Sequence, residues 1–263
     1  MRISRIYVES ELVEGRHIAF DQDRSHYLRH VLRLKPGATI VLFNGCDGKD
    51  YRGKLTLNGK QLGAAIESST FQDNESPLQC SLLQALGRSD HVDWLIQKAT
   101  ELGVQRIILF SAERTQYPPK PDQLAKKQQH WRNVAISACE QSGRARLPTV
   151  NCYPSLTQAI EQDEAKLRLL LHFDGPPLTG HLHNQPGSLS ILTGAEGGLS
   201  TQEIEVAKTH GYHAAAIGPR VLRFETAAIT ALALAQAQAG DLNASDFAQT
   251  KAEDAFESAA NRS

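Results

Sequence analysis

The chain has 263 residues, of which 41% are hydrophobic and 22% charged, and its formal net charge at pH 7 is -1. This length accommodates two modest domains with packed cores, and the absence of an eighteen-residue apolar run or an apolar N-terminal segment argues against membrane insertion and secretion. The chain has four cysteines and no CxxC pair, which argues against a disulfide framework and against a zinc site; they are Cys46, Cys80, Cys139 and Cys152. A protein of the reducing cytoplasm is therefore expected.

The first seventy residues are mildly basic, with 11 Lys and Arg against 8 Asp and Glu. Short segments of β pattern alternate there with turn-forming residues, which predicts a small β-barrel. One helix is predicted at Ser25–Arg33, because Leu28, Val31 and Leu32 recur at a spacing of three to four residues. The predicted strands are Arg5–Val8, Thr39–Phe43, Arg52–Leu57 and Gly63–Glu67.

A polar segment with a proline, residues 71–77, precedes a change to alternating strands and helices. This alternation predicts a mainly parallel sheet with helices on both faces. From Asp241 the chain is polar and acidic, which predicts a disordered tail. The predicted domains are therefore residues 1–72, 73–240 and 241–263. The second holds predicted strands Gln79–Leu86, Arg106–Ser111, Leu167–Phe173, Ser188–Thr193 and His213–Ile217, and predicted helices Val92–Leu102, Leu124–Glu140, one from Ser200, and Thr226–Ala239.

Two loops in this second part carry the strongest signals. The first loop, Thr193–Ser200, follows a buried strand and contains three glycines, which let the backbone approach a ligand closely. Taken alone it is more often only a tight turn between a strand and a helix, and it matches neither G-x-G-x-x-G nor a Walker A motif. Ser200 and Glu203 predict a capping box for the helix that follows. The second loop, Ile217–Thr226, also leaves a short apolar strand and enters an alanine-rich helix. Together they indicate a ligand site at the carboxyl ends of parallel strands.

The pair GAEGGLS and IGPRVLRFETAA resembles the loops of the SPOUT RNA methyltransferases, specifically those that make N3-methyluridine in small-subunit ribosomal RNA. The resemblance covers almost the whole chain up to about Gly240. Further segments in the same order carry it: Arg5-Ile6-Tyr7, HYLRHVLRLKPG at 26–37, DWLIQKATELGV at 93–104, SAERT at 111–115 and ACEQSGRARLP at 138–148.

The resemblance implies an α/β protein with an N-terminal PUA-like RNA-binding β-barrel and a C-terminal α/β domain that is threaded into a deep trefoil knot. It also implies S-adenosylmethionine as cofactor, a homodimer formed through the knotted domains, and 16S ribosomal RNA in the 30S subunit as substrate, with methylation at N3 of uridine 1498. Pattern reasoning alone would have rejected a knot.

Position by position, the resemblance implies that residues at the end of one strand and in both loops contact the cofactor. Two positions depart from the family pattern, which commonly has proline where Ala195 stands and threonine where Phe224 stands. Neither departure removes a glycine, so cofactor binding is expected to survive. The predicted cofactor residues are Leu171, His172, Thr193, Gly194, Ala195, Glu196, Gly197, Gly198, Ile217, Gly218, Leu222, Arg223 and Thr226.

For catalysis the uracil N3 must lose its proton, and a guanidinium can stabilise the charge that spreads onto the ring oxygens. Arg223 is the first candidate for this role, with Arg114 and Arg144 reaching in from a partner subunit. Structural alternatives stay open for each, such as pairing of Arg223 with Glu225 or with the cofactor carboxylate. Glu196 and Glu225 are both candidate proton acceptors, although carboxylates beside glycine loops more often accept backbone amides.

RNA phosphates are predicted to contact basic side chains of the N-terminal domain, for which a solvated basic face is the alternative. His26 and His30 have the i, i+4 spacing of metal ligands, but without further ligands nearby no metal is expected. The predicted RNA-binding residues are Arg5, Arg24, Arg29, Arg33 and Lys35.

Two other functions remain open from the sequence. One is another SPOUT activity, namely 2′-O-methylation of transfer or ribosomal RNA. The other is a non-catalytic RNA-binding or ribosome-assembly factor that keeps the fold without turnover. The PUA-like N-terminus and the EQSGR segment at 140–144 argue against the first. The intact Gly194, Gly197, Gly198 and Arg223 argue against the second.

Overall fold

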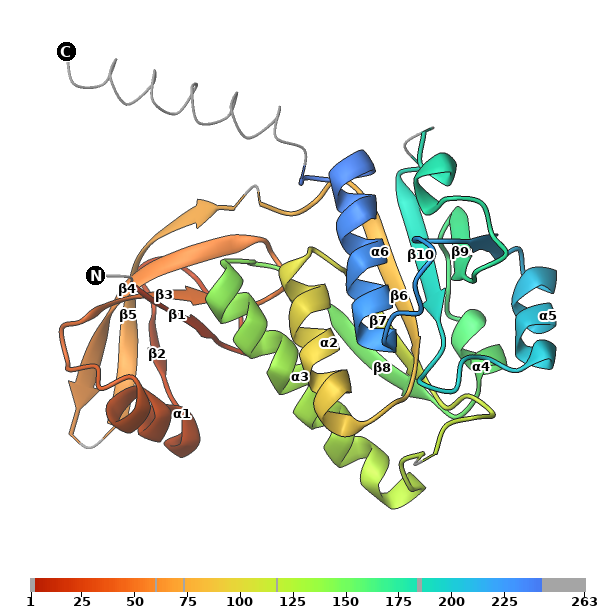
Figure 1. Cartoon of the computed structure of the whole chain (residues 1–263). Coiled ribbons are helices and arrows are strands. Elements are labelled where there is room, and N and C mark those ends of the chain that lie inside the picture. Colours follow the sequence, from red (N-terminus) through yellow and green to blue (C-terminus); the bar gives the residue numbers. More distant parts are fainter. Residues whose placement is uncertain (1–2, 60, 73, 117, 184–185, 243–263) are drawn as a thin grey trace, which may run out of the picture. The chain divides into compact units, whose positions relative to one another are not determined.

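The computed structural model describes residues 3–59, 61–72, 74–116, 118–183 and 186–242. The chain divides into two compact units (Figure 1). Unit 1 contains residues 1–75 and 136–147, and unit 2 contains residues 76–135 and 148–263. Of the predicted tail at 241–263, only Asp241 and Leu242 lie within the described residues.

Unit 1 is built on a five-stranded sheet with the order β1-β3-β4-β5-β2. β1 pairs parallel with β3, and the other neighbours are antiparallel. Apolar residues that alternate along these strands form the core of the unit, together with Leu28 from the helical segment between β2 and β3. The elements are β1 (Ser4–Tyr7), β2 (His17–Ala19), α1 (Gln22–His26), the π-helical turn η1 (Tyr27–Val31), β3 (Thr39–Phe43), β4 (Lys49–Asn58) and β5 (Gln61–Phe71).

Residues 136–147 belong to unit 1, although the sequence placed them in the second domain. They include the last turns of α3 (Pro121–Ser142). Ile136 and Cys139 of this segment pack against Tyr7 and Phe43 of the sheet in one small apolar cluster. The sequence could not foresee this assignment, because it depends on a tertiary contact between segments that are more than ninety residues apart.

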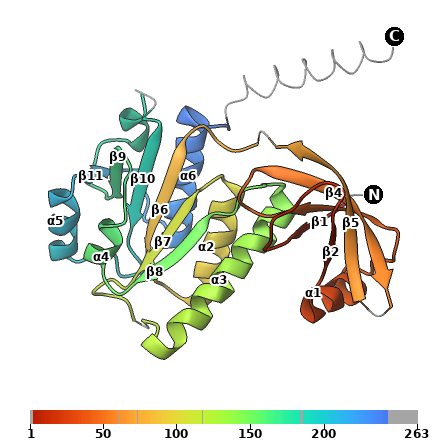
Figure 2. The same ribbon diagram turned by 180° about the vertical axis from the view of Figure 1, so that it is seen from behind.

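Unit 2 contains a six-stranded sheet with the order β11-β9-β10-β6-β7-β8, in which every pair is parallel. The predicted parallel sheet is therefore confirmed. Figure 2 shows the strands side by side from behind. They are β6 (Gln79–Ala85), β7 (Arg106–Phe110), β8 (Thr149–Tyr153), β9 (Leu167–Leu171), β10 (Ser188–Thr193) and β11 (His213–Ala215).

Helices cover both faces of this sheet, as predicted. α2 (Ser89–Glu101) and α6 (Phe224–Ala239) pack together on one face, while α4 (Leu156–Ile160) and α5 (Thr201–Thr209) pack on the other (Figures 1 and 2). Because successive side chains of a strand point to opposite faces, Leu83 and Ile108 join the α4 and α5 side. After β11 at the sheet edge, the chain returns and α6 packs on β10 and β6.

Several elements differ from the sequence prediction. β2, β8, α4 and the short 3-10 helix η2 (Leu178–His181) were not predicted, because each is only three to five residues long. The single helix predicted at Ser25–Arg33 is instead α1 followed by the π-helical turn η1, and Arg33 has a left-handed backbone with φ 54°. No described helix is long and apolar enough to span a membrane.

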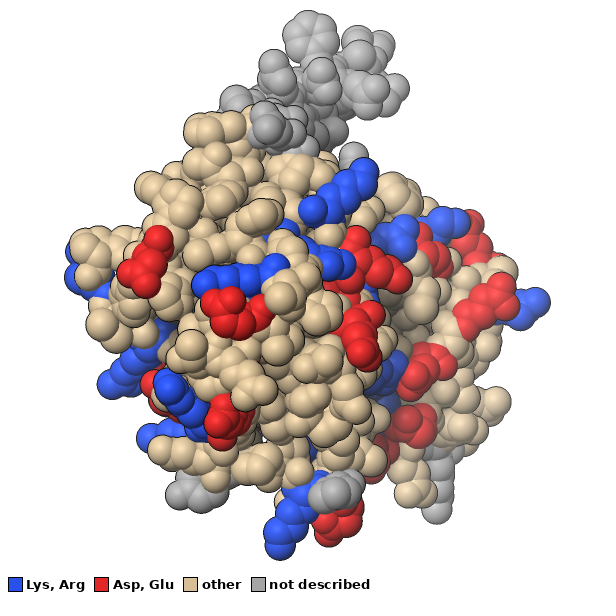
Figure 3. Space-filling model, turned by 90° about the vertical axis from the view of Figure 1, so that its right-hand side faces the viewer, with Lys and Arg blue, Asp and Glu red and all other residues tan. Residues whose placement is uncertain are grey.

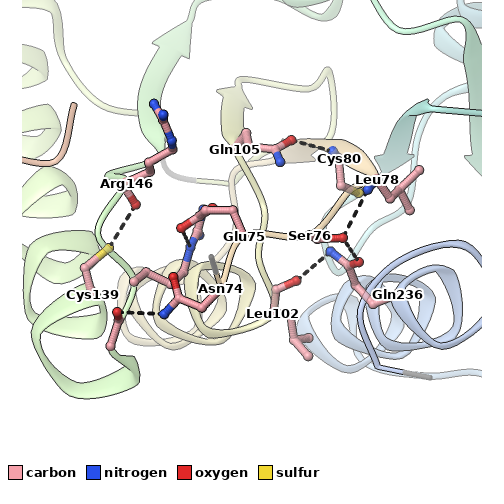
Figure 4. Close-up of polar contacts among 12 residues, drawn as sticks. Asn74, Glu75, Ser76, Leu78, Cys80, Leu102, Gln105, Cys139, Arg146 and Gln236 are labelled. Atoms are coloured by element: carbon pink, nitrogen blue, oxygen red, sulfur yellow. Dashed lines mark hydrogen bonds and ion pairs between the residues drawn. The ribbon is translucent and has the colours of Figure 1, made fainter. Parts of the chain in front are cut away.

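A buried polar network fixes the end of α6 (Figure 4). Gln236 is fully buried; its Oε1 accepts a hydrogen bond from Ser76 Oγ at 2.6 Å, and its Nε2 donates to the Leu102 carbonyl at 2.8 Å. A buried polar group that loses its partner keeps the cost of its desolvation. The network therefore ties the start of unit 2 and the end of α2 to α6.

Replacing Gln236 with leucine should lower the free energy of unfolding by about 2–4 kcal/mol, because the Ser76 hydroxyl and the Leu102 carbonyl would stay buried without partners. Urea unfolding followed by circular dichroism measures this loss. Replacing the exposed Gln202 with leucine provides the control, and equal stability of the two variants would contradict a stabilising role for the network.

Candidate functional site

A cavity of about 770 Å³ lies at the carboxyl ends of β9, β10 and β11. Its wall is formed by the first loop, the second loop, and the starts of α2 and α6. We call it the strand-end cavity. Its volume is within the range of small-molecule sites, and the carboxyl edge of a parallel sheet is where such sites form.

The first loop begins where β10 ends at Thr193 and turns back tightly. Gly198 has φ +66°, and its amide donates to the Ala195 carbonyl at 2.9 Å. At Gly194 a Cβ atom would lie 2.9 Å from backbone atoms of Gly198, so only glycine fits this crossing of the chain. The turn therefore presents backbone groups, rather than side chains, to the cavity.

Two side chains from elsewhere in unit 2 hold the first loop. Gln84 on β6 is fully buried and its Nε2 donates to the Gly194 carbonyl at 2.9 Å. Arg114 donates from Nη1 to the Gly197 carbonyl at 3.0 Å. The predicted capping box at the start of α5 is present, since Ser200 and Glu203 exchange side-chain and backbone hydrogen bonds.

The second loop leads from β11 into α6. Gly218 has φ +128°, a conformation that side chains rarely adopt. α6 begins at Phe224, two residues before the predicted start at Thr226, so Glu225 lies in the first turn of the helix. The amino end of a helix favours a negative charge at this position.

The two departures from the family pattern are both buried apolar side chains. Ala195 joins the core cluster under α4 and α5. Phe224 packs against His91 of α2, with ring centroids 6.0 Å apart. Both residues lie buried on the cavity wall, and neither replaces a glycine of its loop.

The predicted cofactor residues come together in this cavity. All of them line it except Thr226, whose side chain is exposed in the first turn of α6. Their predicted role in binding stays a prediction, and the structure supplies the common location. The lining residues are Leu171, His172, Thr193, Gly194, Ala195, Glu196, Gly197, Gly198, Ile217, Gly218, Leu222 and Arg223.

The predicted catalytic residues are separated by the fold. Arg223 and Glu225 line the cavity. Arg114 contacts the first loop of its own chain, so it needs no partner subunit to reach this region. Arg144 lies in unit 1, where its side chain is 5% exposed and forms two hydrogen bonds with the Glu75 carboxylate, at 3.0 and 2.6 Å. This buried ion pair would have to break for Arg144 to reach the catalytic site of a partner subunit, and its catalytic role stays a prediction.

Sequence reasoning missed several residues of the cavity wall. Arg88 and His91 come from the start of α2, and Phe173, Arg220 and Val221 complete the wall. No local signal marks Arg88 or His91, since more than one hundred residues separate them from both loops. Only the packing of α2 against α6 brings them there.

The predicted RNA-binding residues of unit 1 fall into two groups. Arg5 is 10% exposed; it bonds to Asp50 and to the carbonyls of Cys139 and Arg144, and lies 4.8 Å from the Phe43 ring centroid. These contacts give Arg5 a structural role within unit 1, and its contact with an RNA phosphate stays a prediction. Arg24 is partly exposed and pairs with Glu140 at 3.2 Å, while Arg29, Arg33 and Lys35 are exposed.

On the face shown in Figure 3, acidic and basic side chains are interspersed, so this face presents no single-sign patch to a polyanion. Among the residues that the structure describes, no group of three or more His, Cys, Asp or Glu side chains could hold a metal ion.

Comparison with known proteins gives the same family for both parts of the chain. Residues 74–236 match the model of an RNA methyltransferase domain, and residues 20–66 match that of an RNA methyltransferase PUA domain. Ribosomal RNA small subunit methyltransferase E of Buchnera aphidicola subsp. Schizaphis graminum is 30% identical over 92% of this chain and 99% of its own length. The Bacillus subtilis protein of that name is 25% identical over 88% of this chain and 94% of its own length.

Two solved structures resemble the whole chain. A Legionella pneumophila methyltransferase in complex with S-adenosylmethionine has a TM-score of 0.84 and 35% identity, and covers 92% of this chain and 100% of its own. Ribosomal RNA small subunit methyltransferase E of Neisseria gonorrhoeae, bound to S-adenosylmethionine, has a TM-score of 0.82 and 32% identity over 91% of this chain and 99% of its own. The predicted fold class, a PUA-like domain followed by an α/β domain, is confirmed.

Proposed function

Because this chain belongs to the ribosomal RNA small subunit methyltransferase E family, we propose that it methylates N3 of one uridine, expected to be uridine 1498, in 16S ribosomal RNA. The protein is a methyltransferase and S-adenosylmethionine is its methyl donor. The observation that carries the proposal is the strand-end cavity, which joins the first and second loops at neighbouring strand ends.

The residues of the cavity fit this donor. Gly194 and Gly198 keep side chains out of the first loop, so backbone amides and carbonyls are available to the adenosine and methionine parts. Leu171, Leu222 and Ile217 add apolar contact. The donor supplies an already activated methyl group, so the chain has to orient it, exclude water and prepare the acceptor nitrogen.

Binding of the methyl acceptor, the uracil base, imposes the stricter requirement on the site. Uracil N3 lies on the Watson–Crick edge, so the base must be unpaired and inserted into the cavity. Phe173 and Val221 line the cavity with exposed apolar side chains against which a base can pack. Arg223 supplies a guanidinium to stabilise the negative charge on the ring oxygens, and Glu196 and Glu225 remain the candidate proton acceptors.

Unit 1 supports docking of the RNA through Arg24, Arg29, Arg33 and Lys35. We further propose a homodimer through unit 2, a deep trefoil knot in unit 2, and the 30S subunit in the cytoplasm as the place of action. The return of α6 to the sheet centre after the edge strand β11 is compatible with threading.

Replacing Arg29 and Arg33 together with alanine should weaken RNA binding about 10-fold at moderate salt and lower the salt slope of log K by about 1.5, since two phosphate contacts would be lost. S-adenosylmethionine affinity should stay unchanged. Filter binding at several salt concentrations and calorimetry measure both quantities. Replacing Lys54 with alanine provides the control for loss of a positive charge from the same unit, since Lys54 pairs with Glu67. Loss of donor binding in the double variant would contradict the separate roles of the two units.

Isothermal calorimetry with S-adenosylmethionine tests the methyltransferase assignment. We expect stoichiometric binding by the purified protein. Absence of binding would leave the non-catalytic assembly factor as the better account. The alternative of 2′-O-methylation differs in the product, because that reaction leaves the Watson–Crick edge of the base intact.

A further inference from the structure

Two buried polar groups on the wall of the strand-end cavity have no hydrogen-bond partner among the described residues. They are Oε2 of Glu225, at the start of α6, and Nδ1 of His91, at the start of α2. Glu225 is 8% exposed. Burial of a charged or polar group without a partner is costly, so such groups are candidates to meet a ligand.

The two groups belong to one arrangement. Nδ1 of His91 lies 3.6 Å from Oε1 of Glu225, which is close enough for an ion pair when the imidazole is protonated. Nε2 of His91 lies 3.8 Å from Oδ2 of Asp90, and the Phe224 ring packs against the imidazole. The imidazole thus lies between two carboxylates and beside the Phe224 ring, which is tilted by 39° from it.

This arrangement distinguishes between Glu196 and Glu225, the two candidate proton acceptors that the sequence left open. Oε1 of Glu196 accepts a hydrogen bond from the backbone amide of Arg88 at 3.2 Å, and Glu196 is exposed. Glu225 has no Lys or Arg ion-pair partner within the described part of the chain, and its free oxygen is buried on the cavity wall. A desolvated carboxylate that is held in place is the better proton acceptor.

We propose that Glu225 accepts the N3 proton of the target uracil and that His91 is a positioning residue, whose imidazole lies beside Oε1 and, when protonated, pairs with this buried carboxylate. The inference rests on the proposed function, and it names the proton acceptor that the proposed function leaves open. In the transfer, the N3–H bond breaks and the proton goes to Oε2 of Glu225. The electron pair left on N3 forms the new bond to the methyl carbon, and the pair of the broken carbon–sulfur bond stays on sulfur.

A protonated His91 matters because burial of a carboxylate without a compensating charge is costly. The amino end of α6 gives part of the compensation. A protonated imidazole at 3.6 Å adds a full positive charge beside the same carboxylate. A lysine at this position would keep the charge, whereas a glutamine would keep the polarity and lose the charge.

The test compares Glu225→Gln, His91→Gln and His91→Lys with the wild-type protein, using single-turnover methylation of 30S subunits that lack the modification. Glu225→Gln should lower the rate at saturating donor at least about 100-fold. His91→Gln should lower it about 10-fold, and His91→Lys should restore it to within about 3-fold. Calorimetry should give a donor affinity within about 3-fold of wild type for all three, which also shows that they are folded. His130→Gln, an exposed histidine paired with Asp93 outside the cavity, should behave as wild type.

Three results would overturn the proposal while leaving the proposed function intact: an unchanged rate in Glu225→Gln, a loss of donor affinity in that variant with an unchanged rate at saturation, or equal loss of rate in His91→Gln and His91→Lys. The second would assign Glu225 to donor binding, and the third would show that charge at position 91 is irrelevant. A wild-type protein that binds the donor but yields no N3-methylated uridine would refute the proposed function itself and the inference with it.

Discussion

Replacing Gly194 with valine should reduce the affinity for S-adenosylmethionine at least about 100-fold, equivalent to about 2.7 kcal/mol of binding free energy. A Cβ atom at this position would lie 2.9 Å from the backbone of Gly198 and 3.0 Å from the amide of Leu199. Backbone atoms cannot rotate away as a side chain can, so the first loop has to open. The Gly194 carbonyl would then lose its hydrogen bond with Gln84, which holds the loop to β6.

Calorimetry measures the effect, and thermal unfolding shows whether the variant is folded. Gly180→Val is the matched control, because a Cβ at Gly180 meets nothing within 4 Å and its backbone is unstrained. Gly197→Val should be milder than Gly194→Val, since a Cβ at 197 meets the Arg114 side chain at 3.2 Å and that side chain can move. Wild-type affinity in Gly194→Val would show that the first loop does not hold the donor.

Replacing Arg223 with alanine should lower the methylation rate at saturating donor about 100- to 1000-fold, the range expected when one preorganised donor to a developing negative charge is removed. Arg223 occupies the N-cap position of α6 without a side-chain capping bond, and it lines the cavity two residues before Glu225. Its side chain forms no hydrogen bond or ion pair with the described residues, so it is available to a ligand.

Single-turnover kinetics measure the rate, and calorimetry separates chemistry from binding. Arg223→Lys should recover only part of the rate, because an ammonium lacks the planar donor geometry of a guanidinium. Lys208→Ala, on the exposed side of α5, is the control for a lost positive charge. If Arg223→Ala binds the donor poorly but turns over normally once saturated, Arg223 holds the donor carboxylate instead.

Local sequence signals were sufficient to predict those parts of the site that depend only on residues close together in the chain and on the parallel arrangement of the strands. Thr193 and Ile217 each follow an apolar strand, and parallel strands end at one edge of the sheet, so both loops meet in one cavity. The capping box of Ser200 and Glu203 was equally local and is present. These signals needed no knowledge of packing between distant segments.

Local signals failed where a side chain acts through a distant partner. Arg144 and Arg5 look in the sequence like free cations, but Glu75 and Asp50 neutralise them within unit 1. His91 carries no motif, and its place beside Glu225 exists only because α2 packs on α6. The apolar spacing around Leu28 predicts a helix without distinguishing an α-helix from the π-helical turn that is present.

The central claim is that this chain methylates N3 of a single uridine in small-subunit ribosomal RNA. The most direct test incubates the purified protein and S-adenosylmethionine with 30S subunits that lack the modification, then digests the RNA and identifies the methylated nucleoside and its position by mass spectrometry. We predict 3-methyluridine at one position of the 16S RNA, expected to be uridine 1498. A 2′-O-methylated nucleoside, or no methylated product, would contradict the claim.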